Sequence, residues 1–145
     1  PTWNEGGLSF KLVAGEGYGR KSPVPVYSEL FMVEVKADKA TTLVTGDNLK
    51  GEIGICVVAG SITACGDTIE AGNLMVSKAE DTCAVEVSNG SHLLLFGGQP
   101  FAEERFINWN FVASSQDKIE AARERWQQQQ FEMVPGETGY VPLPK

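Results

Sequence analysis

Apolar and polar side chains alternate in short runs over most of the first three-quarters of the chain. In residues 31–36 every second residue is apolar, and residues 53–58 place Ile53, Ile55 and Val57 on one face of a further strand. A period of two residues is typical of a half-buried β-strand. Many short strands of this kind, joined by turns, predict an all-β sandwich or barrel.

Glycines punctuate this pattern. Gly60, Gly66 and Gly72 are six residues apart, a spacing also found in hexapeptide-repeat β-helices, but the period occurs nowhere else in the chain. We therefore interpret them as turns. The glycine-rich residues 15–19 resemble a phosphate-binding loop, but residues 20–25 that follow cannot start the required helix, so this stretch is predicted to be a plain connection.

The last quarter of the chain has a different pattern. Ile119, Ala122 and Trp126 are spaced by three and four residues, which places them in one stripe of an α-helix. We predict a helix in residues 113–131 and, after it, an extended tail in residues 132–145. The prolines of the tail exclude both a helix and a central strand.

The length of 145 residues is typical of one domain. We expect a single domain overall, in which residues 1–112 form the barrel. The helix is expected to pack on the outside of the barrel, with Trp126 buried against it, because its apolar stripe needs a partner surface.

Charge restricts the choice of partners. The chain has 12 Lys and Arg against 19 Asp and Glu, a net charge of −7. A negative surface repels phosphate backbones and anionic lipids, so neither nucleic acid nor a membrane is expected as a direct partner. Cys56, Cys65 and Cys83 include no Cys-x-x-Cys pair. We interpret them as reduced thiols and expect a cytoplasmic location.

Six groups of residues stand in a recognisable order along the chain. They are Ser22-Pro23-Val24 with Tyr27-Ser28, Val57-Val58-Ala59-Gly60-Ser61, Ile69-Glu70-Ala71-Gly72-Asn73-Leu74, Leu93-Leu94-Leu95-Phe96-Gly97-Gly98-Gln99-Pro100, Trp109-Asn110-Phe111-Val112-Ala113-Ser114-Ser115, and the tail Val134-Pro135-Gly136-Glu137 with Val141-Pro142-Leu143-Pro144. This order resembles the C-terminal domain of the pirin family over nearly the whole chain. The resemblance implies a cupin fold, an antiparallel β-barrel of jelly-roll type, closed by one α-helix and a proline-containing tail.

The resemblance also bears on function. Pirins normally carry two such barrels, and their metal is held by histidines and a glutamate of the N-terminal one. Bacterial members of this kind can show quercetin dioxygenase activity, and eukaryotic members act as nuclear cofactors of transcription factors. Because the chain resembles the second barrel alone, the question is whether that barrel has ligands of its own.

Metal-binding cupins place two histidines, a glutamate and a last histidine in a set spacing, here counted back from Gly60. The corresponding positions are near Asp47 and Leu49 for the first histidines, Ile53 for the glutamate, and near Thr82 or Cys83 for the last histidine. None of them carries the expected ligand. Glu52 is one residue from the glutamate position, and a step of one residue in a strand points to the other face.

We therefore predict no catalytic residue, no metal ligand set and no cofactor. Weak candidates for ligand binding are Glu52, Cys83 and His92, the last being the only histidine. A single imidazole binds a metal poorly unless thiolates assist it. The tryptophans, which could line a pocket, are interpreted as core and interface anchors: Trp3, Trp109 and Trp126.

Three functions remain open. The first is a non-catalytic pirin-like module for binding or assembly, which forms a homodimer or docks on another cupin barrel. The second is the supporting barrel of a pirin-like dioxygenase whose metal-binding barrel is not in this chain. The third is a small-molecule binder that uses the barrel interior. We expect the chain not to be an enzyme by itself.

Overall fold

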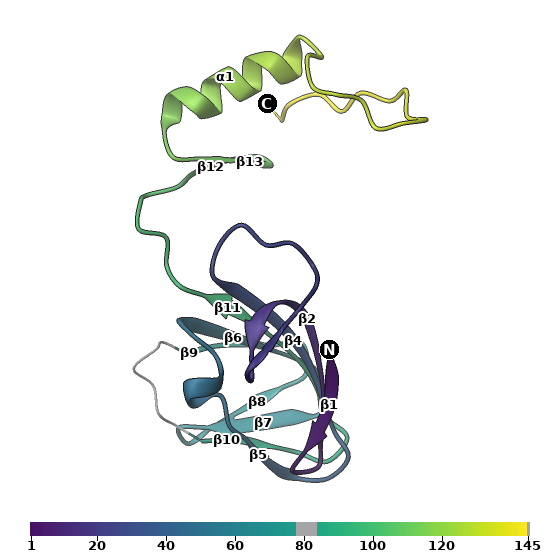
Figure 1. Cartoon of the computed structure of the whole chain (residues 1–145), viewed down its shortest axis with the longest axis vertical. Coiled ribbons are helices and arrows are strands. Elements are labelled where there is room, and N and C mark those ends of the chain that lie inside the picture. The colour runs from purple at the N-terminus through teal and green to yellow at the C-terminus, as the bar shows by residue number, and fades with distance from the viewer. Residues whose placement is uncertain (78–83, 145) are drawn as a thin grey trace. The chain divides into compact units, whose positions relative to one another are not determined.

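The computed structural model describes residues 1–77 and 84–144. The chain divides into two compact units, Pro1–Pro100 and a second unit that begins at Phe101. Each unit is described by itself below (Figure 1). The sequence led us to expect the barrel to continue to residue 112, whereas the strands after residue 100 belong to the second unit.

The first unit contains a large and a small antiparallel sheet, which form two facing layers (Figure 1). This arrangement confirms the predicted all-β class. Across the large sheet the strands are β1 (Thr2–Glu5), β2 (Leu8–Gly17), β4 (Leu30–Ala37), β11 (His92–Gly98), β6 (Glu52–Ala59) and β9 (Leu74–Ser77), with β3 (Arg20–Lys21) paired to β2. Across the small sheet they are β5 (Thr41–Leu43), β10 (Val85–Val87), β7 (Ser61–Ala64) and β8 (Asp67–Glu70).

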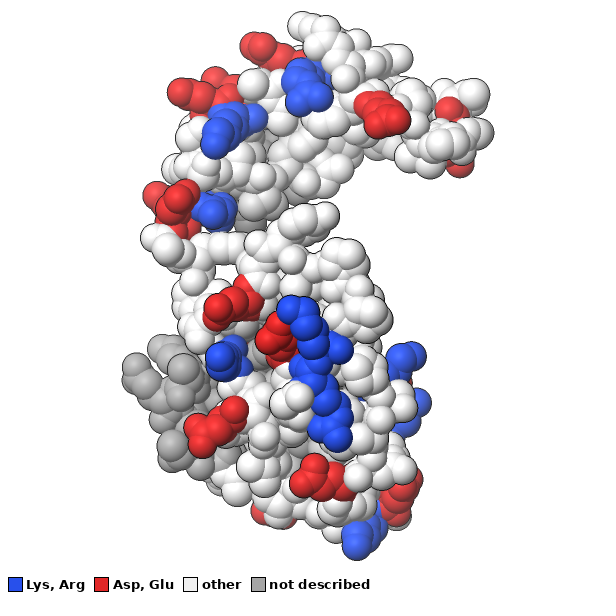
Figure 2. Space-filling view, viewed as in Figure 1, with Lys and Arg blue, Asp and Glu red and all other residues white. Residues whose placement is uncertain are grey.

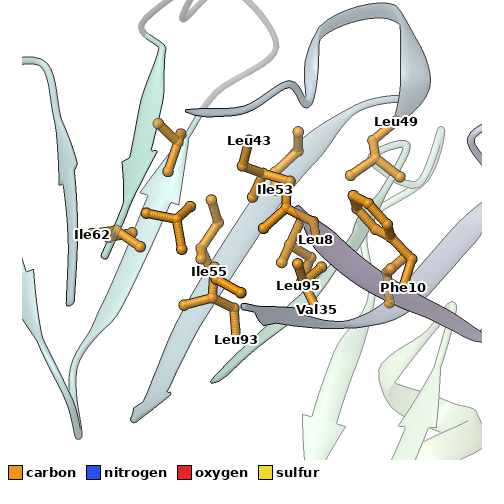
Figure 3. Close-up of a cluster of buried hydrophobic side chains, with 14 of the residues drawn as sticks. Leu8, Phe10, Val35, Leu43, Leu49, Ile53, Ile55, Ile62, Leu93 and Leu95 are labelled. Atoms are coloured by element: carbon orange, nitrogen blue, oxygen red, sulfur yellow. The ribbon is translucent and has the colours of Figure 1, made fainter. Parts of the chain in front are cut away.

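The core fills the space between the two sheets. Every second residue of the central strands points inward, as the alternation predicted: Val33, Val57, Leu93 and Leu95, for example, are fully buried. Ile62 and other inward residues of the small sheet meet them from the opposite layer. Figure 3 shows this cluster, which consists of hydrocarbon side chains.

The three regularly spaced glycines lie in turns between consecutive strands, as the sequence indicated. Gly60 connects β6 to β7, Gly66 connects β7 to β8, and Gly72 connects β8 to β9. Cys65 and Gly66 both have positive φ, 52° and 92°, which is the geometry of the two-residue hairpin turn that matches the twist of its strands. The six-residue period therefore reflects one hairpin turn at Gly66, between the paired strands β7 and β8, and two turns at Gly60 and Gly72 that pass between the sheets.

The second unit consists of a hairpin, a helix and a tail. Its elements are β12 (Phe106–Asn108), β13 (Phe111–Ala113) and α1 (Gln116–Gln127). The helix is shorter than predicted because Gln129 has a positive φ of 54°, and the amide of Gln130 donates to the Arg125 carbonyl. These are features of the Schellman motif, which ends helices.

The tail after the helix has no regular structure among its described residues, in keeping with its prolines. Its predicted turn at Pro135-Gly136 is present, since Gly136 has a φ of 85° and the amide of Glu137 donates to the Val134 carbonyl at 3.0 Å. The tail then contacts the helix: Trp126 Nε1 donates to the Val141 carbonyl at 2.7 Å, and the Trp126 ring stacks on Tyr140.

Candidate functional site

The barrel interior is the first place to look for chemistry, because the cupin ligand positions predicted from Gly60 fall there. Leu49 and Ile53 are 5% and 7% exposed, and both belong to the continuous apolar core. Figure 3 shows the two side chains among the carbon-only side chains of the cluster. Asp47 lies in a 3-10 turn (Gly46–Asn48) and is exposed.

Glu52 illustrates why a carboxylate one residue away cannot take the place of the missing glutamate. It is the first residue of β6, in which Ile53, Ile55 and Val57 are buried, whereas Glu52 is exposed. Successive side chains of a strand point to opposite faces, so Glu52 lies on the outer face of the large sheet. The structure therefore removes it from the barrel interior.

His92 also lies on the outer face, at the start of β11. Its Nε2 is 2.9 Å from Glu34 Oε1, and Lys36 Nζ is 3.1 Å from the same oxygen. The hydrogen bond from Lys36 is the main cause that holds the pKa of Glu34 below its ordinary value, and His92 adds to it. His92 is thus part of a half-exposed ion cluster with Glu34 and Lys36.

The candidate residues do not converge on one site. Glu52 pairs with Gly98 and His92 pairs with Ala59, at opposite ends of the paired strands β6 and β11. His92 and Gly98 are six positions apart, which corresponds to about 20 Å along a strand. Cys83, the third candidate, lies outside the described residues, as does Thr82.

The two cysteines that the structure describes, Cys56 and Cys65, differ in whether the sulfur is bonded to another sulfur. Cys56 is a free, half-buried thiol on the outer face of β6. Cys65 is disulfide-bonded, so the expectation of three reduced thiols is wrong for this residue. Sequence spacing could not reveal this, because disulfide formation depends on which parts of the chain meet in space.

No metal centre is formed by the residues that the structure describes. Within residues 1–77 and 84–144, no group of three or more His, Cys, Asp or Glu side chains is arranged to hold an ion. The cupin metal requires several imidazoles with a carboxylate, and the two described inner positions carry Leu49 and Ile53 instead. The donor set therefore does not fit a cupin metal.

An open groove of about 590 Å³ lies beside the glycine-rich connection between β2 and β3. Its cationic side chains are Arg20, Lys21 and Lys50, but two of them are already engaged. Lys21 forms an ion pair with Glu16 at 2.7 Å, and the Arg20 guanidinium packs 4.3 Å from the centre of the Trp3 ring. Figure 2 shows a stripe of basic side chains on the visible face of the first unit, with acidic side chains beside and around it.

A smaller cavity of about 330 Å³ opens between the two sheets. It is lined mainly by apolar side chains, among them Ile53, Ile55, Ile69 and Met75. Such a cavity offers apolar contact but few polar groups that could orient a substrate.

The tryptophans contribute to packing, as the sequence analysis expected. Trp3 stacks on Phe10 with ring centres 4.8 Å apart, at the edge of the barrel core. In the second unit, Trp126 makes edge contacts with Trp109 and Phe111. Whether the helix packs on the barrel through this cluster stays a prediction.

Comparison with known families agrees with this architecture. Residues 30–132 match the pirin C-terminal cupin domain. The chain belongs to the pirin family. A pirin-like protein of Caulobacter vibrioides is 34% identical over 146 residues, which cover 100% of this chain and 50% of the relative. A curated relative from Pseudomonas aeruginosa is 31% identical over 129 residues, 88% of this chain and 41% of its own length.

Solved structures show the same fold. A quercetin 2,3-dioxygenase from Acinetobacter baumannii superimposes with a TM-score of 0.85 at 30% identity, over 100% of this chain and 50% of that one. A second structure of the same name and organism, at 18% identity, matches with a TM-score of 0.67 over 88% of this chain and 45% of its own. The fold is thus a cupin jelly roll, and the chain spans about half the length of the relatives that it matches.

Sequence reasoning missed one feature of this pirin domain, the outer face of its large sheet. Phe96, Leu74 and Val76 are 42%, 51% and 64% exposed there. The sequence contains a signal for this apolar outer face. Residues 93–96 are all apolar, and Val57 is followed directly by Val58, so both faces of these strands carry apolar side chains. A strand that is apolar on both faces is typical of a sheet covered on both sides.

Proposed function

We propose that this pirin domain is a non-catalytic cupin module that serves in binding or assembly and holds no transition metal. One observation carries the proposal: Leu49 and Ile53 fill two inner positions where a metal-binding cupin places a histidine and its glutamate. Hydrocarbon side chains cannot coordinate an ion, so these two positions supply no ligand.

Metal analysis tests the proposal. The purified, untagged protein is incubated with Fe²⁺, Mn²⁺, Ni²⁺ or Zn²⁺ in separate samples, passed through gel filtration and analysed for metal content. We expect far less than one metal per chain in each sample. His92→Ala is the matched control for adventitious binding at the single histidine. One tightly bound metal per chain that persists in His92→Ala would show that the barrel contains a site after all.

The relatives support a second role that is compatible with the first. The A. baumannii protein that matches over the whole of this chain carries the name quercetin 2,3-dioxygenase, and half of it lies beyond the match. We propose that a domain like this one supports the catalytic part of such an enzyme without supplying ligands. The isolated chain should then show no quercetin turnover with added iron. Turnover by the wild type that is lost in Ile53→Phe would contradict this proposal, because it would locate the activity inside this barrel.

The apolar cavity between the sheets favours a third, weaker proposal. Its volume of about 330 Å³ suits a small apolar molecule. A thermal-shift screen of flavonols and other small apolar compounds tests it, with Ile55→Phe as the variant that fills the cavity. Stabilisation of both proteins alike would place the compound elsewhere.

The described helices include none with the length and apolar character needed to cross a membrane. The cytoplasmic location expected from the sequence stays a prediction, which fractionation of cells that express the native gene would test.

A further inference from the structure

The end of the helix and the tail after it enclose a pocket of about 260 Å³ within the second unit, which we call the tail pocket. Three aromatic rings line it, those of Trp126, Phe131 and Tyr140, together with the carboxylates of Glu132 and Glu137. No lysine or arginine is among the described residues that line it. A lining of aromatic rings and carboxylates is complementary to a positively charged ligand.

Hydrogen bonds hold the walls of the tail pocket in place. The indole N–H of Trp126 donates to the Val141 carbonyl at 2.7 Å, which fixes the ring against the tail. The amide of Glu137 donates to the Val134 carbonyl at 3.0 Å and closes the turn at Gly136. The pocket is therefore formed before a ligand enters it, which reduces the entropy that binding costs.

The rings differ in the surface that they leave for a ligand. Phe131 is stacked on Phe111 with ring centres 5.8 Å apart, and the Arg125 guanidinium lies 4.4 Å from the centre of the same ring. A ring and a guanidinium cannot share one face, so both faces of Phe131 are occupied. Trp126 and Tyr140 are the rings with free surface, and Tyr140 is 41% exposed.

Charge in the tail has one sign. Residues 128–144 contain Glu132 and Glu137 but no lysine or arginine. Both glutamates are exposed, and neither forms an ion pair within the described ranges 1–77 and 84–144. Two carboxylates without a cationic partner there attract a cation to the tail pocket.

The apolar part of the lining restricts the kind of cation. Met133, Val134 and Val141 contribute hydrocarbon and thioether groups to the wall. Such groups cannot replace the water around a metal ion or a bare ammonium, so a strongly hydrated cation gains little from entering. A quaternary ammonium carries its charge beneath methyl groups, which pack against apolar walls while the charge faces the aromatic rings.

We propose that the tail pocket binds a small, free quaternary ammonium compound, whose trimethylammonium group contacts Trp126 and Tyr140 beside Glu132 and Glu137. The volume of about 260 Å³ is below that of pockets for drug-sized ligands, so the ligand is a small molecule. The inference goes beyond the proposed function, because the tail pocket belongs to the second unit and uses no residue of the barrel.

A choline titration of the full chain, followed by NMR, tests the class of ligand. The indole N–H of Trp126 reports on the tail pocket, and that of Trp3 in the first unit serves as the internal control. We expect choline to shift the Trp126 signal saturably and to leave the Trp3 signal in place. The neutral tert-butyl analogue of choline has nearly the same shape without the charge, and it should bind at least about fivefold more weakly.

Matched variants test the site. Tyr140→Leu keeps an apolar side chain but removes the aromatic ring, and it should weaken choline binding at least about fivefold. Tyr27→Leu makes the same change at a fully exposed tyrosine of the first unit and should have no effect. Glu132→Gln and Glu137→Gln should each weaken binding, whereas Glu120→Gln, at an exposed position of the helix outside the pocket, should not.

Amide hydrogen exchange in residues 101–144 establishes that each variant keeps the second unit folded. If Tyr140→Leu loses protection, the glutamate variants decide, because Glu132→Gln and Glu137→Gln change exposed side chains alone.

Three outcomes would overturn the proposal. No saturable shift with choline would remove the site, and equal affinity for choline and its neutral analogue would show that the pocket is merely apolar. Equal weakening by Glu137→Gln and Glu120→Gln would assign the attraction to the charge of the whole unit. The metal content of the barrel tests the non-catalytic assignment separately, because no residue of the tail pocket lies in the barrel.

Discussion

At the scale of single residues, two neighbouring positions of β6 lie in opposite environments. Glu52 is exposed on the outer face of the sheet, whereas Ile53 points into the barrel and is 7% exposed. Composition alone cannot distinguish these positions. The strand period of two distinguishes them, because it assigns each side chain to one face.

The first prediction concerns Ile53. Replacing it by glutamate buries a carboxylate among hydrocarbon groups and should lower the free energy of unfolding by about 3 kcal/mol or more. Ile53→Val removes one methyl group and should cost about 0.5–1.5 kcal/mol. Urea unfolding measures both. A stable Ile53→Glu protein that gains tight metal binding would contradict the conclusion that the other ligands are missing.

The second prediction concerns the pKa of Glu34. Its pKa is lowered chiefly by the hydrogen bond from Lys36, so a carboxyl titration by NMR should give a value below the ordinary one. The pKa should rise in Lys36→Gln, and rise less in His92→Gln. Because the folded-state pKa is depressed, the contribution of Glu34 to stability is present above its unfolded pKa and is lost as the pH falls through the folded one.

An equal rise of the Glu34 pKa in Lys36→Gln and in His92→Gln would show that His92 lowers this pKa as much as Lys36 does. The ion cluster is partly exposed and therefore contributes little to stability, so the pKa is a better readout than the melting temperature.

At the scale of elements, the turns at Gly60 and Gly72 connect the two sheets. Ser91, next to Gly60, is buried, and its hydroxyl lies 2.8 Å from Ser88 Oγ and donates to the Ser61 carbonyl at 3.1 Å. The amide of Ser61 donates to the hydroxyls of both serines. This satisfied polar network fixes the point at which the chain passes from the large sheet to the small one.

The third prediction compares two turn glycines. Gly60 has a φ of 75°, and a Cβ there would lie 2.8 Å from the Cα of Ser91. Gly66 has a φ of 92°, but no atom lies within 4 Å of its added Cβ. Gly66→Ala should therefore cost about 1–2 kcal/mol of stability from the backbone alone, and Gly60→Ala clearly more. Similar losses in urea unfolding would mean that Ser91 moves aside easily.

The fourth prediction concerns Trp126, which holds the second unit together by contacts with Trp109, Phe131 and Tyr140. The ring is only half-buried, so Trp126→Ala should cost about 2–3 kcal/mol, below the range for a fully buried tryptophan. Trp126→Phe retains most of the packing and should cost about 1 kcal/mol for the lost hydrogen bond to Val141.

Amide hydrogen exchange in residues 101–144 measures this loss, with Gln128→Ala as a control at an exposed position. Unchanged protection in Trp126→Ala would mean that the aromatic cluster contributes little to the unit and that its surface is available to another partner.

At the scale of the whole molecule, the net charge of −7 governs which partners can approach. The fifth prediction is that the chain does not bind duplex DNA at physiological ionic strength, because a negative protein gains nothing from counterion release. A gel-shift titration with duplex DNA measures the binding. If the chain does not bind DNA directly, it can be recruited to DNA only through a protein partner. A shift that weakens steeply with added salt would reveal a basic surface strong enough to overcome the net charge.

Much of this protein was determined by the sequence itself. Periods of two and of 3.6 predicted a β-barrel followed by a helix, because each period matches one way of pointing apolar side chains to a single side. The missing ligands at Leu49 and Ile53, and the family resemblance, came from residue identity and order alone. Local patterns of this kind need no knowledge of which strands are neighbours.

The tertiary structure decided the rest, because the remaining features depend on residues far apart in the sequence. Only strand pairing places Gly54 between Phe96 and Val76, with the Phe96 ring against the glycine, and so gives the large sheet an exposed apolar outer face. Pairing likewise places His92 beside Glu34, 58 positions earlier in the chain. It also sets Glu52 and His92 at opposite ends of the paired strands β6 and β11, since position across a sheet follows from register and not from local composition.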